Sequence, residues 1–524
     1  MEITISAILI SFVFLFILTW VLKAAGWVWF KPKRLERRLR SLGFYGHPYK
    51  FLFGNKKDIG LMTRLSTSEP MDHFSNDYCN RVTPFHYQTI KDYGDSSFYW
   101  DGPTPTIIIT KPEIVREIMM KMYDFPKPIL HPLMNKFTRG LVRLEGQEWA
   151  QDRKLINPAF HMNKLKNMVT AFQVSCNDMI DEWEKITSKT GTYELEIWSS
   201  VQNMSADAIS RAAFGSSFKE GKKVFELLRD HLGIIIKVLQ SVYIPGWRFL
   251  PTKTNNKSAK ITKEIEVLLK GMIYKRQKAI QEGEVAKDDL LGILLKSYYE
   301  GIQDKNQDEN RNQQNLKISL KQVIEECKLF YIAGQETTSA LLVWTLILLS
   351  KNKDWQEQAR EEVINKFGHN KPNFDGLNDL KKVSMILHEV LRLYPPITSL
   401  TRKVSQDVKV GDALLPGGVH INVPMIYIQH DEKLWGGDAK EFKPERFSQG
   451  IIKATQGNMS FFSFGWGPRI CIGSNFAMIE AKLTLTNILQ QFTFELSPSY
   501  IHAPTLGFGT LRPQFGAQLI FCRI

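Results

Sequence analysis

The sequence predicts a mainly α protein with small β-sheets and a single N-terminal transmembrane helix. Apolar residues recur at helical spacing through most of the 524 residues, and this spacing is clearest over 224–240, 262–281, 320–350, 355–367 and 380–393. Short β-branched runs at 106–109 and 419–423 predict strands. A long uncharged apolar run at the start of the chain predicts the membrane helix.

The run from Ile3 to Leu22 has no charged side chain, and about twenty apolar residues span a bilayer as a helix. Aromatic residues and the basic stretch 31–40 follow it, as expected for the cytoplasmic side of a membrane. A cleaved signal peptide is the alternative, but its charges would precede the apolar run. We therefore predict a signal anchor over 1–22, a basic juxtamembrane linker over 23–50 and one folded domain over 51–524.

The formal net charge of +14 does not predict nucleic-acid binding. About half of the excess lies in the juxtamembrane stretch, and no nucleic-acid-binding motif is recognisable. Membrane lipid headgroups and an acidic redox partner explain the charge better. The five cysteines are scattered without a Cys-x-x-Cys pair, which argues against a zinc ribbon, a dithiol redox site and a disulfide framework.

The stretch from Phe464 to Gly473 reads Phe-x-x-Gly-x-Arg-x-Cys-x-Gly and contains Cys471. A thiolate there can be the axial ligand of haem iron, and glycines allow close approach to a flat cofactor. The helix-forming run that follows favours an anionic sulfur, and Arg469 can neutralise a propionate. A buried structural thiol is the alternative. The pattern resembles the haem-binding loop of cytochrome P450 monooxygenases, which implies that Phe464, Arg469, Cys471 and Gly473 contact haem b (iron protoporphyrin IX) and that Cys471 binds its iron.

A second motif, Ala-Gly-Gln-Glu-Thr-Thr at 333–338, lies inside a strongly apolar predicted helix. A glycine there costs about 1 kcal/mol relative to alanine, so it needs a reason. One reason is a groove for O₂, beside which Glu336 and Thr337 relay protons. The alternative is a contact between two helices. The motif resembles the distal-helix motif of the same family, which implies that Glu336 and Thr337 are catalytic.

Glu389 and Arg392 lie three residues apart on another predicted helix and hence on one face. Such pairs are common on surfaces, and this one gains meaning from Arg446 in the later run Pro-Glu-Arg-Phe. The resemblance implies that Glu389, Arg392 and Arg446 form a buried structural network behind the haem. Removing one member of such a network costs about 3–5 kcal/mol.

Trp149 and Arg153 lie one helical turn apart. The matching residues of the family bind a haem propionate, whereas an ordinary amphipathic helix is the alternative. Arg402 follows a double-proline turn and is a third propionate candidate.

Several stretches resemble a plant branch of the family that contains secologanin synthase and triterpenoid oxidases. Examples are Asn-Pro-Ala-Phe at 157–160 and Tyr-Ile-Pro-Gly-Trp at 243–247. This implies a hydrophobic terpenoid substrate with an iridoid, triterpenoid or steroid scaffold. We expect the pocket to be lined by 125–144, 329–337, 397–400 and 506–511, which are mostly apolar. His131 is the polar exception in the first stretch: it binds a substrate carboxylate or hydroxyl, or it faces water.

The resemblance implies a membrane-anchored haem-thiolate monooxygenase domain over 51–524. It would use O₂ and electrons from NADPH-cytochrome P450 reductase, because no Gly-x-Gly-x-x-Gly opens a strand–helix unit for a nicotinamide cofactor here. NADPH would then give its electrons to the reductase and not directly to this protein. The implied location is the endoplasmic reticulum membrane, single-pass, with the catalytic domain in the cytosol. A reductase-independent haem-thiolate isomerase or dehydratase and a non-catalytic haem protein are the alternatives, and the Glu336-Thr337 pair argues against both.

Overall fold

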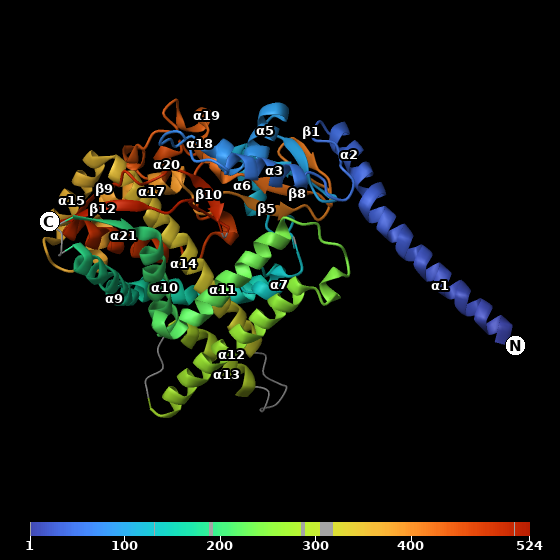
Figure 1. The fold of residues 1–524 in the computed structure, drawn as a ribbon, viewed down its shortest axis with the longest axis horizontal. Helices are drawn as coiled ribbons and strands as arrows, with labels where there is room; N and C mark the ends of the chain where they lie inside the picture. Colours follow the sequence, from blue (N-terminus) through green and yellow to red (C-terminus); the bar gives the residue numbers. More distant parts are fainter. Residues whose placement is uncertain (1, 130, 188–191, 284–288, 304–317, 508) are drawn as a thin grey trace.

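The protein consists of one long exposed N-terminal helix and a helical body that holds four small sheets (Figure 1). The computed structural model describes residues 2–129, 131–187, 192–283, 289–303, 318–507 and 509–524. The predicted class, mainly α with small sheets, is confirmed.

The helices of the first half are α1 (Glu2–Ala25), α2 (Lys31–Ser41), α3 (Lys56–Ser66), α4 (Cys79–Val82), α5 (Pro84–Tyr93), α6 (Pro112–Met120), α7 (Met134–Phe137), α8 (Gly146–Ile156), α9 (Met162–Thr187), α10 (Ile197–Phe214) and α11 (Phe218–Leu239). Those of the second half are α12 (Lys253–Gln281), α13 (Leu290–Gln303), α14 (Leu320–Lys351), α15 (Lys353–Phe367), α16 (Phe374–Asp379), α17 (Lys381–Leu393), α18 (Met425–His430), α19 (Glu432–Trp435), α20 (Ile451–Ala454) and α21 (Ser474–Gln491). Short π or 3₁₀ segments are η1 (Gly26–Phe30), η2 (Asn157–Phe160), η3 (Trp247–Phe249), η5 (Pro444–Phe447) and η6 (Gly467–Arg469).

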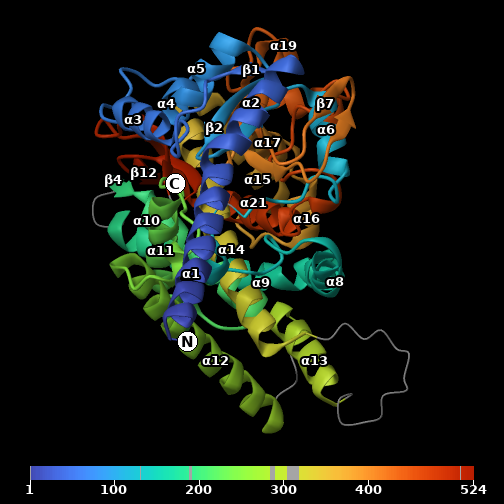
Figure 2. The same cartoon turned by 90° about the vertical axis from the view of Figure 1, so that its right-hand side faces the viewer.

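The N-terminal helix α1 projects away from the body (Figures 1 and 2). Its apolar side chains from Leu9 to Leu22 are exposed, which fits a membrane anchor. The helical path continues through η1 and α2. Part of the predicted basic linker is therefore helical and packs on the body, where Leu35 and Leu39 are buried.

The strands are β1 (Tyr45–Gly46), β2 (Ser97–Asp101), β3 (Thr104–Ile108), β4 (Thr192–Glu196), β5 (Leu400–Lys403), β6 (Val408–Val410), β7 (Ala413–Leu415), β8 (His420–Val423), β9 (Phe492–Leu496), β10 (Pro504–Gly507), β11 (Thr510–Pro513) and β12 (Gln518–Arg523). The largest sheet has the order β1-β2-β3-β8-β5. Both predicted strands belong to it, and they pair in parallel, with Ile107 opposite Ile421. The three other sheets are β4-β12-β9, β6-β7 and β10-β11.

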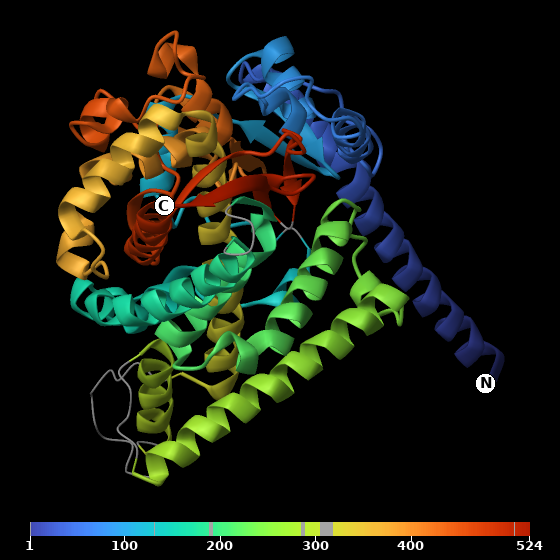
Figure 3. The same ribbon diagram turned by 60° about the vertical axis from the view of Figure 1, so that its left-hand side comes forward.

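Helix α14 crosses the body and carries the distal motif (Figures 1 and 2). It is long and apolar enough to span a membrane, but it is mostly buried inside the protein and is therefore a core helix. Helices α10 and α21 pack against α14, α9 packs against α10 and α21, and all four helices contribute to one apolar core. Helix α12 runs along the edge of the body, and its connection with α11 lies on the side from which α1 projects (Figure 3).

All five predicted helices are confirmed as α11, α12, α14, α15 and α17, with ends that differ by a few residues. Two of the ends follow from capping that the apolar pattern does not show. Ser217 and Ser319 begin α11 and α14, each with a capping box.

Candidate active site

The loop before α21 holds Cys471 in a fixed position. The Cys471 N–H donates to the Phe464 carbonyl at 2.8 Å. Gly465 and Gly467 have φ values of +76° and +68°, which side chains other than glycine rarely adopt. A Cβ on Gly467 would lie 2.7 Å from the Met119 carbonyl oxygen. Close approach to α6 is therefore one reason for a glycine at 467.

The Cys471 thiol is accessible. It is exposed, whereas Cys79, Cys176 and Cys327 are buried. Burial nevertheless raises the pKa of Cys471, because the surrounding protein removes bulk solvent; the Gly473 N–H, Arg153 and Lys127 oppose this effect. The same three groups favour a thiolate at this sulfur.

Next to this loop lies a cluster of cationic side chains, Lys127, Arg143, Arg402 and Arg469, with a single carboxylate, Glu145. Glu145 pairs with Arg469 at 2.5 Å. Burial and the neighbouring arginines Arg402 and Arg469 lower the pKa of Lys127 to about 7. Burial, followed by Arg469, lowers the pKa of Arg402 to about 10. The cluster thus carries more positive charge than one carboxylate balances.

Trp149 and Arg153 both lie at this cluster. They share one face of α8, as a spacing of one helical turn predicts. The Arg469 guanidinium stacks on the Trp149 ring, 4.4 Å from its centroid. Arg153 Nη1 donates to the Ile470 carbonyl at 2.9 Å, which ties α8 to the residue before Cys471.

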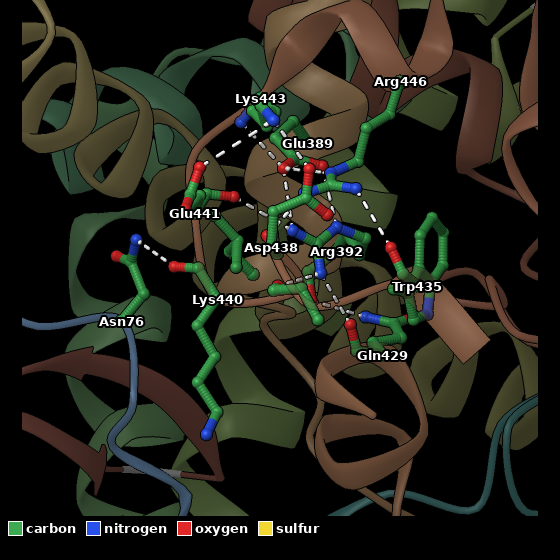
Figure 4. A network of polar contacts seen from close by, with 12 residues as sticks. Asn76, Glu389, Arg392, Gln429, Trp435, Asp438, Lys440, Glu441, Lys443 and Arg446 are labelled. Atoms are coloured by element: carbon green, nitrogen blue, oxygen red, sulfur yellow. Dashed lines mark hydrogen bonds and ion pairs between the residues drawn. The ribbon is translucent and has the colours of Figure 1, made fainter. Parts of the chain in front are cut away.

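The structure brings Glu389, Arg392 and Arg446 together (Figure 4). Glu389 and Arg392 are fully buried. Arg392 Nε and Nη2 each donate to one carboxylate oxygen of Glu389 at 2.7 Å, a bidentate pair. Arg446 Nε lies 3.4 Å from Glu389 Oε1, and its Nη2 lies 2.7 Å from Asp438 Oδ1.

Gln429 connects this network with the cysteine loop. Arg392 Nη1 donates to the Gln429 carbonyl at 2.8 Å. The Gln429 side chain in turn accepts from the Phe462 N–H at 3.3 Å and from the Ser463 hydroxyl at 3.0 Å. Because Phe464 follows directly, the buried ion pair is linked to the segment that holds Cys471.

Helix α14 is open at one place. Between Val323 and Ser350 only Ala333, Gly334 and Thr337 are not buried. Ala333 and Thr337 lie four residues apart and so on one face, and the Thr337 hydroxyl donates to the Ala333 carbonyl at 2.7 Å. The lone pairs of Thr337 are therefore free for a donor in the open space.

Gly334 lies where α14 packs closely on α10. A Cβ at this position would lie 2.8 Å from Cγ1 of Ile209 on α10. The glycine permits this close packing, which supports the alternative of a helix–helix contact; the groove for O₂ stays a prediction.

Glu336 is buried on another side of α14. Its Oε1 accepts from Gln202 Nε2 at 2.8 Å, while Oε2 has no hydrogen-bond partner in the described parts of the chain. Burial raises the pKa of Glu336, and Arg229, Arg512 and the Gln202 amide oppose it. Among the described residues no hydrogen bond joins Glu336 to Thr337, so the two side chains are neighbours in sequence only.

His131 is buried rather than facing water, so that alternative is wrong. Its Nδ1 accepts from the Leu133 N–H at 3.1 Å, and its ring meets Tyr243 edge-on at 5.0 Å. Burial, followed by Lys56, lowers the pKa of His131, so the ring is neutral at pH 7.

Sequence reasoning missed Lys127, Glu145, Gln202 and Arg229. Lys127 lies in the predicted pocket stretch, and a basic residue in an apolar lining was a usable signal. Gln202 and Arg229 occupy ordinary positions of amphipathic helices, and no local pattern distinguishes them.

Comparison with known proteins identifies the family. A sequence model of the cytochrome P450 family matches residues 79–521. Cytochrome P450 72A397 of Kalopanax septemlobus is 50% identical over 96% of both chains. Echinocystic acid 23-monooxygenase of Saponaria officinalis is 48% identical over 97% of both chains. 11-oxo-beta-amyrin 30-oxidase of Glycyrrhiza uralensis is 48% identical over 96% of both. The chain belongs to the cytochrome P450 family and is a monooxygenase of plant type.

A solved structure confirms the fold. Retinoic acid bound cyanobacterial CYP120A1 matches with a TM-score of 0.74 at 22% identity, covering 92% of this chain and 99% of that one. Membership of the family means that the protein carries haem b and receives electrons that originate from NADPH through a redox partner.

The residues described above fit haem b. Cys471 offers an accessible sulfur amid groups that favour a thiolate. Arg469 Nη1 and Arg143 Nε are buried without a hydrogen-bond partner in the described structure. Buried cations in excess and unsatisfied N–H groups match the two carboxylates of a haem.

Proposed function

We propose that this protein is a haem-thiolate monooxygenase that oxidises a plant terpenoid at a site between Cys471 and the open face of α14. The observation that carries this proposal is the accessible Cys471 thiol beside a buried cation cluster with unsatisfied donors. When bound there, haem supplies the iron on which O₂ is reduced, so that one oxygen atom enters a C–H bond and the other leaves as water.

In this proposal the chain holds the cofactor with three sets of residues. Cys471 would bind the iron as a thiolate, with Phe464 and Gly473 beside it in the same loop. Arg402 and Arg469 neutralise the propionates, and Lys127 adds a third cation. Trp149 stacks on Arg469 and so orients its guanidinium, and Arg153 orients the loop through the Ile470 carbonyl.

Two residues of α14 handle the protons. The Thr337 hydroxyl donates its hydrogen bond to the Ala333 carbonyl, so it can hold a water by accepting a hydrogen bond from it. Glu336 is the proton donor in this proposal, because burial raises the pKa of its carboxyl and so favours the protonated form. This pair supports a monooxygenase over an isomerase or a non-catalytic haem protein.

The substrate class rests on the relatives. Two of them are named for the oxidation of echinocystic acid and 11-oxo-beta-amyrin, and the predicted lining of the pocket is mostly apolar. An iridoid, triterpenoid or steroid scaffold therefore fits best. His131 is a substrate contact in this proposal, through the ring nitrogen that does not bond to Leu133.

The exposed apolar helix α1 and the basic α2 support a single-pass anchor in the endoplasmic reticulum membrane, with the body in the cytosol. NADPH-cytochrome P450 reductase, anchored in the same membrane, is the proposed electron donor.

Turnover in microsomes that contain this chain and a plant reductase tests the function. Iridoid acids, pentacyclic triterpenoids and sterols are supplied, and NADPH-dependent gain of oxygen is followed by mass spectrometry. We expect a product from one class that Cys471→Ala abolishes. No product from any class, despite a normal haem spectrum, would show that the substrate lies outside these three classes.

His131→Ala sharpens the substrate assignment. We expect it to weaken the binding of acid substrates more than that of their neutral analogues, as measured by the shift of the haem spectrum on titration. Equal weakening for both would show that His131 only shapes the loop.

A further inference from the structure

A cavity at the surface lies where three segments meet: α7 with the residues after it, the short η3 segment between α11 and α12, and the first turns of α14. Its volume is about 380 Å³, which is at the lower end for small-molecule sites. Its described lining shares no residue with the cysteine loop or with the cation cluster beside that loop. The cavity is therefore separate from the site described above.

Four basic side chains line this cavity. They are Lys136 of α7, Arg139 shortly after it, Arg248 of η3 and Lys321 of α14, and all four residues are exposed. Arg139 has one ion pair, a long contact of 4.0 Å with Glu148. The side chains of the other three form no hydrogen bond or ion pair with any group in the described parts of the chain. Their charges therefore remain available to a ligand.

Glu325 is the one acidic residue in the described lining of the cavity, and its carboxylate is already used. Its Oε1 accepts from Lys328 Nζ at 2.7 Å, and its Oε2 accepts from the backbone N–H of Arg139 at 2.7 Å. Lys328 is buried, so its charge cancels that of Glu325 within the protein. The four cations therefore face the cavity without a free carboxylate to balance them.

Part of the lining is apolar. Phe249 is 76% exposed, and the Arg248 guanidinium lies 4.6 Å from the centroid of its ring. Pro132 and Leu133 line the cavity as well and directly follow His131. An anion with a hydrocarbon body fits this lining, because its charge meets the cations while its body covers apolar side chains.

We propose that this cavity is an outer binding site for the carboxylate of an acid substrate. The inference rests on the proposed function and narrows its substrate class to terpenoids that carry a carboxyl group. A hollow lined by charges of one sign raises the local concentration of ligands of the opposite charge and speeds their association. The cavity borders the segment that carries His131, so an acid held there lies next to the proposed substrate contact.

Equilibrium dialysis of the purified full-length protein with its haem tests the site. The ligands are an iridoid acid and a triterpenoid acid, each compared with its methyl ester, which lacks the charge. We expect wild type to bind the acid more tightly than the ester. The double variant Lys136→Gln/Arg248→Gln, called the cavity variant, should bind the acid about fivefold more weakly and the ester unchanged, because each exposed ion pair contributes little.

Both replaced side chains are exposed, so the cavity variant keeps the core of the protein intact. Wild type that binds acid and ester equally would overturn the proposal. Equal weakening of acid and ester in the cavity variant, or no weakening of either, would overturn it as well.

Lys371→Gln/Lys409→Gln is the matched control. Lys371 lies between α15 and α16 and Lys409 lies on β6, and both are exposed and outside the cavity. This variant has the same net charge as the cavity variant, and we expect it to bind the acid as wild type does. If the two double variants weakened acid binding equally, the effect would come from overall charge and the cavity would not be the site.

The rival ligand for the cavity is the headgroup of an anionic lipid. The protein is reconstituted in phosphatidylcholine vesicles with added phosphatidylserine and extracted again, and the lipid that it retains is identified by mass spectrometry. We expect wild type and the cavity variant to retain the same lipids. Selective loss of phosphatidylserine from the cavity variant, together with unchanged acid binding, would overturn the proposal and assign the cavity to a lipid headgroup.

Stopped-flow mixing separates this inference from the proposed function, because it follows the change of the haem spectrum as the acid arrives. We expect the acid to associate about tenfold more slowly with the cavity variant at low salt, and the difference to shrink at high salt. Equal association rates for wild type and the cavity variant would contradict the proposal. If no acid changes the haem spectrum of wild type, the proposed terpenoid substrate fails, while dialysis still decides whether the cavity binds carboxylates.

Discussion

Glu389 and Glu336 are both buried carboxylates near arginines, but their surroundings differ. Glu389 takes a bidentate pair from Arg392 and a further hydrogen bond from the Lys443 N–H at 3.0 Å. Glu336 takes one hydrogen bond from a neutral amide and leaves Oε2 unpartnered among the residues described. Both oxygens of the first group are hydrogen-bonded to a guanidinium, whereas the second group has an oxygen at which a proton would break no bond.

The difference separates a structural role from a chemical one. A fully bonded buried ion pair resists any change of charge or position, so it can hold the cysteine loop through Gln429. A buried carboxyl with a raised pKa and a free oxygen is typical of a functional site. The following variants test this contrast, beginning with the largest effect.

Arg392→Leu should destabilise the fold most. It leaves Glu389 buried without its bidentate partner, at a cost of about 3–5 kcal/mol. We expect a lower urea midpoint and little haem incorporation in purified protein. A change below about 1 kcal/mol would show that the network is not structural.

Glu336→Gln should leave folding unchanged and damage chemistry. Without the acid, product formed per NADPH should fall about 10²-fold, while substrate binding, followed by the haem spectrum, stays the same. If Glu336→Gln lowered the free energy of unfolding as well as product formation, Glu336 would have a structural role like that of Glu389.

Glu480 on α21 is a third buried carboxyl that can be compared with Glu389 and Glu336. Both of its oxygens lack hydrogen-bond partners in the described structure, and burial raises its pKa to about 8. The folded protein therefore binds this proton more tightly than the unfolded chain, and stability falls as pH rises from about 4.5 to about 8. Wild type should lose on the order of 2 kcal/mol more than Glu480→Gln between about pH 5 and pH 7. Urea unfolding at several pH values measures this loss. If the stability of the two proteins changed equally with pH, the prediction would be wrong.

Gly334→Ala should have the smallest effect. The new methyl group would press on Ile209, and overpacking of this kind costs about 1–3 kcal/mol. Thermal unfolding measures the loss, and the double variant with Ile209→Val should recover part of it. No loss of stability would mean that the space at Gly334 serves another purpose.

Periodicity and motifs predicted the fold class, the five helices and both strands, because apolar spacing determines which elements form. The resemblance to the cytochrome P450 family also implied that Glu389, Arg392 and Arg446 would meet. Periodicity and motifs could not predict that Gly334 packs against Ile209 or that Gln202 contacts Glu336, since both contacts join helices far apart in sequence. The direction of the Glu336 side chain likewise depends on which helix packs on which face of α14.

The central claim is that Cys471 binds the haem iron. The carbon monoxide spectrum of the reduced, purified protein tests it most directly, in wild type and in Cys471→Ala and Cys176→Ala, the latter being a buried cysteine outside the loop. We predict the spectrum of a thiolate-bound haem in wild type and Cys176→Ala and its loss in Cys471→Ala. The same thiolate spectrum in Cys471→Ala would contradict the account.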